Sequence, residues 1–113
     1  MEYQAGLSEI TAGDLKRRLD AGEEVAILDV REPHELEICK LDYTFHIPLG
    51  QLPTRVSELG SQKDKDFVVY CRSGKRSERA CQFLRESGFT KVSNLKGGIL
   101  AWANDIDPSM ARY

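Results

Sequence analysis

The stretch VVYCRSGKRSERACQFLRESG, residues 68–88, carries the pattern of a strand, a loop and a helix in that order. Its first residues are apolar and favour β-structure, which is typical of a strand buried on both faces. Its second half predicts an amphipathic helix that begins near Ser77 and ends at Gly88, with an apolar side formed by Ala80, Cys81 and Leu84. Units of this kind are the building blocks of α/β domains.

The same alternation continues on both sides of this unit. Further strands are predicted at EVAILDV (24–30), FHIPL (45–49) and KVSNL (91–95). Helices are predicted after the N-cap Thr11, and over PHELEICKL (33–41), QLPTRVSELG (51–60) and GGILAWAND (97–105). We therefore predict an α/β domain with a central, mainly parallel sheet of about five strands.

Length and composition limit the domain organisation and the partners. A chain of 113 residues is long enough for one hydrophobic core, so we predict one domain over 1–113, with residues 1–7 and 106–113 peripheral. The net charge of −2 gives no reason to expect nucleic acid or a membrane as a partner. The sequence has no apolar run of about 20 residues and no signal-peptide pattern, so we expect a cytoplasmic protein.

Cys71 ends a predicted strand, at the edge of the sheet where the active sites of α/β proteins form. The following helix directs its N-terminal N–H groups and the positive end of its dipole toward the sulfur. The nine residues 71–79 contain only one acid, Glu78, but four cations, which are Arg72, Lys75, Arg76 and Arg79. Cations and a helix N-terminus both lower the pKa of a thiol, so we expect Cys71 to be a nucleophile.

The small residues of the loop suit the binding of an anion. Gly74 allows the backbone to approach a bound group closely, and Ser77 is expected both to cap the helix and to donate a hydrogen bond. The alternative is a buried structural cysteine beside a solvated basic loop, since free cysteines are often buried. A structural cysteine has no use for four cations, so the reactive interpretation is favoured.

The sequence CRSGKRS, residues 71–77, resembles the active-site loop of rhodanese-type sulfurtransferases. In that family a cysteine carries a sulfane sulfur as a persulfide inside a ring of backbone amides. ILDVRE (27–32), HIP (46–48) and LKGGILAW (95–102) match the other family signatures. The resemblance implies a rhodanese-like three-layer fold with Cys71 as the catalytic residue, and a persulfide-binding loop made of Arg72, Ser73, Gly74, Lys75, Arg76 and Ser77.

Other polar residues are expected to have non-catalytic roles. Asp29 and Arg31 are expected to form a structural ion pair or to brace the loop. His34 and His46 are not needed as bases for a thiolate that its surroundings already stabilise, and with Cys39 they lack the usual spacing of zinc ligands. We expect no metal and no cofactor. A role of Cys39 as a resolving thiol stays open.

The sequence NLKGGILAWANDIDPSMARY, residues 94–113, is similar to the C-terminal end of the rhodanese domain in adenylyltransferase-sulfurtransferases. In those proteins an E1-like domain adenylates a ubiquitin-like sulfur carrier, and the rhodanese domain supplies sulfur for molybdopterin or thiolated-tRNA synthesis. This resemblance implies that the chain is the excised C-terminal domain of such a protein and that a ubiquitin-like sulfur-carrier protein is an acceptor. The nucleotide and zinc sites of the E1-like domain are not carried over.

We therefore predict a sulfurtransferase that takes sulfur from thiosulfate or a protein persulfide onto Cys71 and passes it to a nucleophilic acceptor. Two alternatives stay open. The first is a phosphatase or arsenate reductase on the same fold, although those enzymes have a Cys-x5-Arg loop, which is one residue longer than the Cys-x4-Arg loop in this chain. The second is a non-catalytic docking module, which would use the basic loop only to dock an acidic partner.

Overall fold

A five-stranded parallel sheet forms the centre of the protein. The computed structural model describes residues 8–113. The strands lie in the order β1-β5-β4-β2-β3, and every neighbouring pair is parallel, as predicted. They are β1 (Glu9–Ile10), β2 (Val25–Asp29), β3 (Phe45–His46), β4 (Asp66–Tyr70) and β5 (Val92–Leu95). The sequence did not predict β1, because two residues are too few to show a strand pattern.

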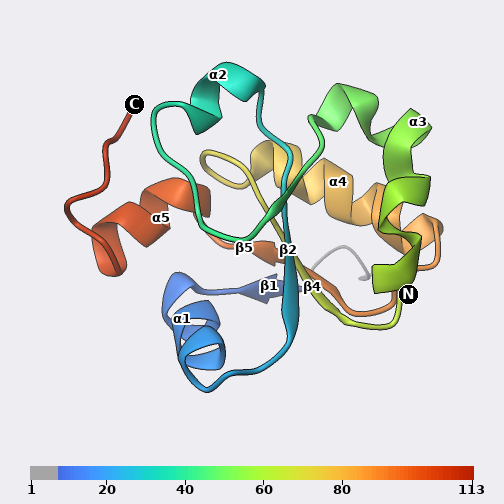
Figure 1. The fold of residues 1–113 in the computed structure, drawn as a ribbon, viewed down its shortest axis with the longest axis horizontal. Coiled ribbons are helices and arrows are strands. Elements are labelled where there is room, and N and C mark those ends of the chain that lie inside the picture. The colour runs from blue at the N-terminus through green and yellow to red at the C-terminus, as the bar shows by residue number, and fades with distance from the viewer. Residues whose placement is uncertain (1–7) are drawn as a thin grey trace.

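Helices cover both faces of this sheet, which makes three layers (Figure 1). One face carries α1 (Ala12–Asp20) and α5 (Gly98–Asp105). The other carries α4 (Lys75–Glu86) and the helical segment around α3 (Leu52–Arg55). A single turn, α2 (Pro33–Leu36), lies beyond the end of β2. Within residues 8–113, no helix combines the length and the apolar character that a membrane crossing requires.

Alternate residues of β4 enter two separate hydrophobic cores. Phe67, Val69 and Cys71 pack in the core beneath α4, whereas Val68 and Tyr70 pack in the core beneath α1 and α5. A strand buried on both faces has to be apolar throughout, which explains the continuous apolar run in the sequence. Cys71 is therefore held at the end of the central strand, on the α4 side.

The helix after Cys71 begins earlier than predicted. It starts at Lys75, and Gly74 is its N-cap residue with φ of +111°. A left-handed glycine turns the chain into the helix over a short distance, so the helix needs no side-chain cap there. Ser77 consequently lies in the first helical turn, and the prediction that it caps the helix is wrong. At α1 the predicted cap is confirmed, since Thr11 Oγ1 accepts the N–H of Asp14 at 3.1 Å.

The segment 51–60 is not one regular helix. Only Leu52–Arg55 is α-helical, and it is flanked by the 3-10 turns η2 (Leu49–Gln51) and η3 (Val56–Gln62). The proline in its first turn lacks a backbone donor, and Arg55 departs from helical dihedral angles at φ of −117°. These two features explain why a sequence pattern typical of one helix forms a short α-helical turn between two 3-10 segments.

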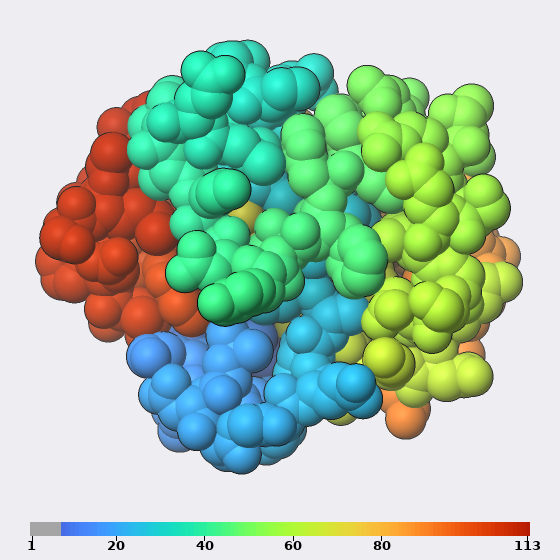
Figure 2. Space-filling view, in the orientation of Figure 1, coloured from blue at the N-terminus to red at the C-terminus, as the bar shows by residue number. Residues whose placement is uncertain are grey.

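The C-terminal segment is held against the domain more closely than predicted. Residues 106–113 were expected at the periphery, but Ile106, Met110 and Tyr113 pack against the core beneath α1 and α5. Figure 2 shows this segment (red) lying against the part of the chain that carries α2 (teal). Residues 1–7, which were also expected to be peripheral, lie outside the described residues. One domain over 1–113 stays a prediction.

The N-terminus of α5 is attached to the backbone of the Cys71 loop. The N–H of Ile99 donates to the Cys71 carbonyl at 3.0 Å, and the N–H of Leu100 donates to the Arg72 carbonyl at 3.2 Å. This approach is so close that a Cβ atom on Gly98 would lie 2.6 Å from the Cys71 carbonyl oxygen. Gly98 also has φ of +61°, which disfavours any other residue.

We expect Gly98→Ala to lower the free energy of unfolding by roughly 2–4 kcal/mol, because it combines an unfavourable φ with overpacking against the loop. Urea unfolding of both proteins measures this difference. Gly50→Ala is the matched control, since a Cβ atom at Gly50 meets nothing within 4 Å. Equal stability of the Gly98→Ala and Gly50→Ala variants would contradict the close approach.

Candidate active site

The Cys71 sulfur is enclosed by its own loop. Only 1% of the residue is exposed, although it stands at the end of a strand. The N–H of Gly74 donates to Sγ at 3.1 Å, and the Ser77 hydroxyl lies 3.3 Å from Sγ. The loop therefore presents polar hydrogens to a sulfur that water hardly reaches.

Burial and hydrogen bonding act on this thiol in opposite directions. Burial raises the pKa of Cys71, whereas the N–H groups of Ser77, Gly74 and Ser73 lower it by stabilising the thiolate, and so does the Ser77 hydroxyl when it donates to sulfur. The hydrogen bonds outweigh burial, so the pKa lies below the ordinary value of a thiol. The sequence pattern predicted that the loop cations help to lower this pKa, but the groups in contact with Sγ are backbone N–H groups and a hydroxyl.

Arg76, in the first turn of α4, is paired with a carboxylate. Arg76 Nη1 and Nη2 donate to Oε1 and Oε2 of Glu35 at 2.7 and 2.9 Å. The hydrogen bonds from Arg76 are the main reason that the pKa of Glu35 is lowered to about 2, against the opposing effect of burial. This bidentate ion pair joins α4 to α2 across a sequence separation of 41 residues. The sequence did not identify Glu35, because nothing local indicated its partner.

Asp29 and Arg31 form the predicted structural ion pair. Both side chains are fully buried, with Arg31 Nη2 2.8 Å from Asp29 Oδ2 and Arg31 Nε 3.0 Å from Oδ1. Arg31 also donates to the Cys39 carbonyl at 2.8 Å, and its own carbonyl contacts His46 Nε2 at 2.7 Å. The pair thus organises the segment around α2. Whether it supports the catalytic loop stays a prediction.

Tyr113 connects the C-terminal segment to the same polar network. Its hydroxyl donates to Glu35 Oε2 at 2.6 Å and accepts from Arg31 Nη1 at 3.0 Å. Its ring lies 5.0 Å from the guanidinium carbon of Arg72, whose Nε donates to the Tyr113 carbonyl at 2.7 Å. Arg72 is therefore directed toward the C-terminal segment. Lys75, like Arg72, has an exposed side chain.

Asn94 on β5 supports the loop from beneath. It is 5% exposed, its Nδ2 donates to the Gly74 carbonyl at 3.0 Å, and its Oδ1 accepts from the Ser77 hydroxyl at 2.5 Å. The signal in the sequence was the single amide in the predicted short strand KVSNL. A buried amide in such a strand needs hydrogen-bond partners, and here it has them in the loop.

The two remaining thiols differ from Cys71 in their surroundings. Cys81 is fully buried, and burial is the main reason that its pKa is raised to about 12, so it is a poor nucleophile. Cys39 is half-buried and makes no disulfide. Among residues 8–113, no cluster of three or more His, Cys, Asp or Glu side chains is suited to hold a metal ion.

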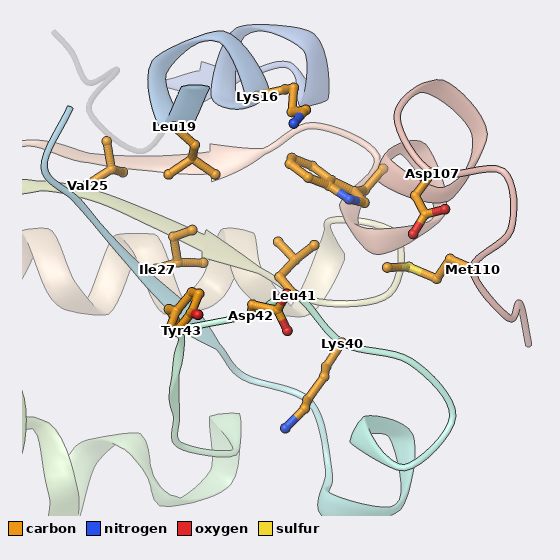
Figure 3. Close-up of a pocket in the computed structure, with 11 residues that line it drawn as sticks. Lys16, Leu19, Val25, Ile27, Lys40, Leu41, Asp42, Tyr43, Asp107 and Met110 are labelled. Carbon is orange, nitrogen blue, oxygen red and sulfur yellow. The ribbon is translucent and has the colours of Figure 1, made fainter. Parts of the chain in front are cut away.

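A cavity of about 530 Å³ lies elsewhere on the molecule (Figure 3). Its lining comes from α1, β2, residues 40–43, α5 and the segment that follows α5, and it includes the apolar side chains of Leu41 and Trp102. Loop 71–77 contributes none of its lining residues. This cavity is therefore separate from the loop that encloses Cys71.

Comparison with known proteins agrees with the geometry. The family profile described as "Rhodanese-like domain" matches residues 11–105. A sulfurtransferase of Allochromatium vinosum is 40% identical over 93% of this chain and 96% of its own length. An adenylyltransferase and sulfurtransferase of Zea mays is 36% identical over 94% of this chain, which spans 24% of that longer protein. The crystal structure of a rhodanese-related protein from Thermoplasma volcanium shares 32% identity, with a TM-score of 0.78 over 88% of this chain and 93% of that one. The predicted resemblances are confirmed.

The ion pair between Glu35 and Arg76 predicts an acid-dependent contribution to stability. A carboxyl whose pKa is lowered in the folded state stabilises the protein above its unfolded pKa, and this contribution is lost as the pH falls toward about 2. We expect Glu35→Gln to lower the free energy of unfolding by about 2–3 kcal/mol at pH 7. The difference from the wild type should shrink between pH 5 and pH 2, roughly the range of the linkage.

Denaturant unfolding at several pH values measures this difference. Glu58→Gln is the matched control, because Glu58 also pairs with an arginine, Arg55, but lies at the exposed surface. That variant should change little at any pH, since exposed ion pairs contribute little. A difference for Glu35→Gln that stays constant from neutral to acid pH would show that the charge of Glu35 is not what stabilises the fold.

Proposed function

The chain belongs to the rhodanese-like domain family and is a rhodanese-type sulfurtransferase, and on that premise we propose that Cys71 carries the transferred sulfur as a persulfide. The observation that supports this role most directly is the hydrogen bond from the Gly74 N–H to the enclosed Cys71 sulfur. It is part of a set of loop donors that favour an anion on sulfur.

In the first step the Cys71 thiolate attacks the outer sulfur of a donor. With thiosulfate, a new S–S bond forms between Sγ and that outer sulfur, and the original S–S bond breaks. Sulfite leaves with the electron pair of the broken bond, so no external oxidant is needed. The N–H groups that stabilise the thiolate are available to the outer sulfur of the persulfide, which is also anionic at neutral pH.

In the second step an acceptor nucleophile attacks the outer sulfur, and the Cys71 thiolate leaves with the electron pair of the S–S bond. The enzyme returns to its starting state, and the exchange as proposed uses no metal and no cofactor. A covalent intermediate shared by two half-reactions leads to ping-pong kinetics. Three cysteines without a disulfide suit a reducing compartment such as the cytoplasm, which we propose as the site of action.

The relatives that join a sulfurtransferase to an adenylyltransferase support a narrower proposal for the acceptor. We propose that a ubiquitin-like sulfur-carrier protein with an adenylated C-terminus receives the sulfur. With this acceptor the roles in the second step are reversed, because an acyl adenylate is an electrophile: the outer persulfide sulfur attacks the acyl carbon and AMP leaves, which joins the carrier to Cys71 through an acyl disulfide. A thiol reductant then cleaves the S–S bond and releases the carrier thiocarboxylate, which is the sulfur form that molybdopterin synthesis consumes.

The state of Arg76 argues against phosphatase or arsenate reductase chemistry. Both of its terminal nitrogens donate to Glu35, so its guanidinium is committed to a carboxylate of the protein. The loop is also shorter than the Cys-x5-Arg loop that makes room for a tetrahedral oxyanion. Sulfur transfer needs only the backbone donors around Sγ.

Intact mass measurement after incubation with thiosulfate tests the persulfide directly. We expect a gain of one sulfur atom, about 32 Da, that a reductant reverses. Cys71→Ala should lack the gain, whereas Cys81→Ala, the control at the buried thiol of α4, should keep it. Absence of an adduct with both thiosulfate and a protein persulfide donor would instead support the docking or phosphatase alternatives.

Salt dependence tests whether the exposed cations attract an anionic donor. Lys75 is exposed at the start of α4, close to the loop. A single charge about 10 Å away in water interacts with the thiosulfate dianion by about 0.8 kcal/mol, so Lys75→Gln should raise KM for thiosulfate roughly fourfold at low salt. The effect should vanish at high salt. Lys91→Gln, at the opposite end of the sheet, should leave KM unchanged, and equal effects of both variants would contradict local attraction.

A further inference from the structure

The Ser77 hydroxyl lies between two groups that compete for its single proton. It is 3.3 Å from Cys71 Sγ and 2.5 Å from Asn94 Oδ1. All three residues are buried. A serine hydroxyl donates one hydrogen bond and can accept others, so it serves only one of these neighbours as a donor at a time.

The orientation of the Asn94 amide decides which neighbour receives the proton. Nδ2 donates to the Gly74 carbonyl at 3.0 Å, and a carbonyl can only accept. Oδ1 therefore faces Ser77, and it too can only accept. The contact of 2.5 Å between Ser77 and Asn94 is consequently a hydrogen bond donated by Ser77.

This arrangement fits the neutral thiol and opposes the thiolate. While Ser77 donates to Asn94, it offers a lone pair to Sγ, which suits an S–H donor. To stabilise a thiolate, the hydroxyl must turn toward sulfur and leave Asn94 Oδ1 without a donor in a buried site. An acceptor left unsatisfied in such a site costs free energy, so the asparagine resists the turn.

We propose that Asn94 is a positioning residue that controls the protonation of Cys71 by competing for the Ser77 hydroxyl proton. The backbone N–H groups of the loop favour the Cys71 thiolate, whereas Asn94 disfavours it until the Ser77 hydroxyl turns toward sulfur. As a result, part of the resting enzyme keeps Cys71 as the less reactive thiol. The Ser77 hydroxyl donates to Asn94 while Cys71 is a thiol and to sulfur when Cys71 becomes a thiolate. The consequence for turnover rests on the proposed function, but the protonation of Cys71 does not.

The test is the pH dependence of Cys71 alkylation by iodoacetamide, followed at the peptide level by mass spectrometry. Asn94→Leu retains roughly the shape of the side chain and offers no acceptor, so Ser77 is free to donate to sulfur. We expect the alkylation midpoint to fall by about one pH unit, which is about a tenfold gain in rate below both midpoints. If Asn94 merely braced the loop, its loss would disorder the N–H groups and raise the midpoint.

Two further variants separate competition for the proton from general disturbance of the loop. Asn94→Asp keeps an acceptor oxygen for Ser77 in either of its protonation states, so the midpoint should not fall. In a Ser77→Ala background, which has no hydroxyl to compete for, Asn94→Leu should no longer lower the midpoint. Thermal unfolding checks that each variant is folded, and Asn94→Ala replaces Asn94→Leu if the latter is not.

A rise or no change with Asn94→Leu, an equal fall with Asn94→Asp, or a fall that persists without the Ser77 hydroxyl would each overturn the proposal. The measurement uses no sulfur donor. A protein that forms no persulfide with thiosulfate can therefore still show the predicted midpoints, and failure of the proposed function is distinguishable from failure of this inference.

Discussion

A buried sulfur that becomes anionic needs hydrogen-bond donors in place of water, and the elements around Cys71 are arranged to meet this need. The loop after β4 turns its N–H groups inward, so its carbonyl groups point outward and require donors of their own. The N-terminus of α5 supplies two of them, to the carbonyls of Cys71 and Arg72. Asn94 supplies a third, to Gly74. The close packing of α5 and β5 against the loop follows from this division of backbone groups.

The charged residues of the site hold the loop in place and leave contact with the sulfur to neutral dipoles. Arg76 is paired with Glu35, and Arg72 is directed toward Tyr113. Because Glu35 also accepts from Tyr113, α2, α4 and the C-terminal segment meet at one carboxylate. Fixed dipoles suit a sulfur that passes between thiol, thiolate and persulfide, since they need little reorganisation as its charge changes.

Local patterns predicted the layers of the fold and directed attention to the Cys71 loop, because both leave their signal in consecutive residues. An apolar run indicates burial on both faces, as in β2 and β4, and Cys71 with its glycine and four cations occupies nine consecutive residues, 71–79. Glu35, Asn94 and Tyr113 were missed because their partners lie 17 or more residues away in sequence. The cations were expected to stabilise the thiolate and to attract an anion, but two of them, Arg72 and Arg76, instead bind other groups of the protein. The start of α4 was misplaced because a glycine with positive φ gives no capping signal.

In the proposed mechanism, the burial of Cys71 also makes the two half-reactions different. With 1% of the residue exposed, the first step requires a donor sulfur slim enough to pass between the loop and its surroundings. Once the persulfide has formed, an S–S bond of about 2 Å separates the reactive outer sulfur from the buried Sγ. The second step then takes place farther from the protein interior and tolerates a larger acceptor. Under this proposal the fold restricts the entry of sulfur at the buried Sγ and allows its delivery from the outer sulfur, which suits loading from a small or protruding donor and delivery to a larger acceptor such as a protein.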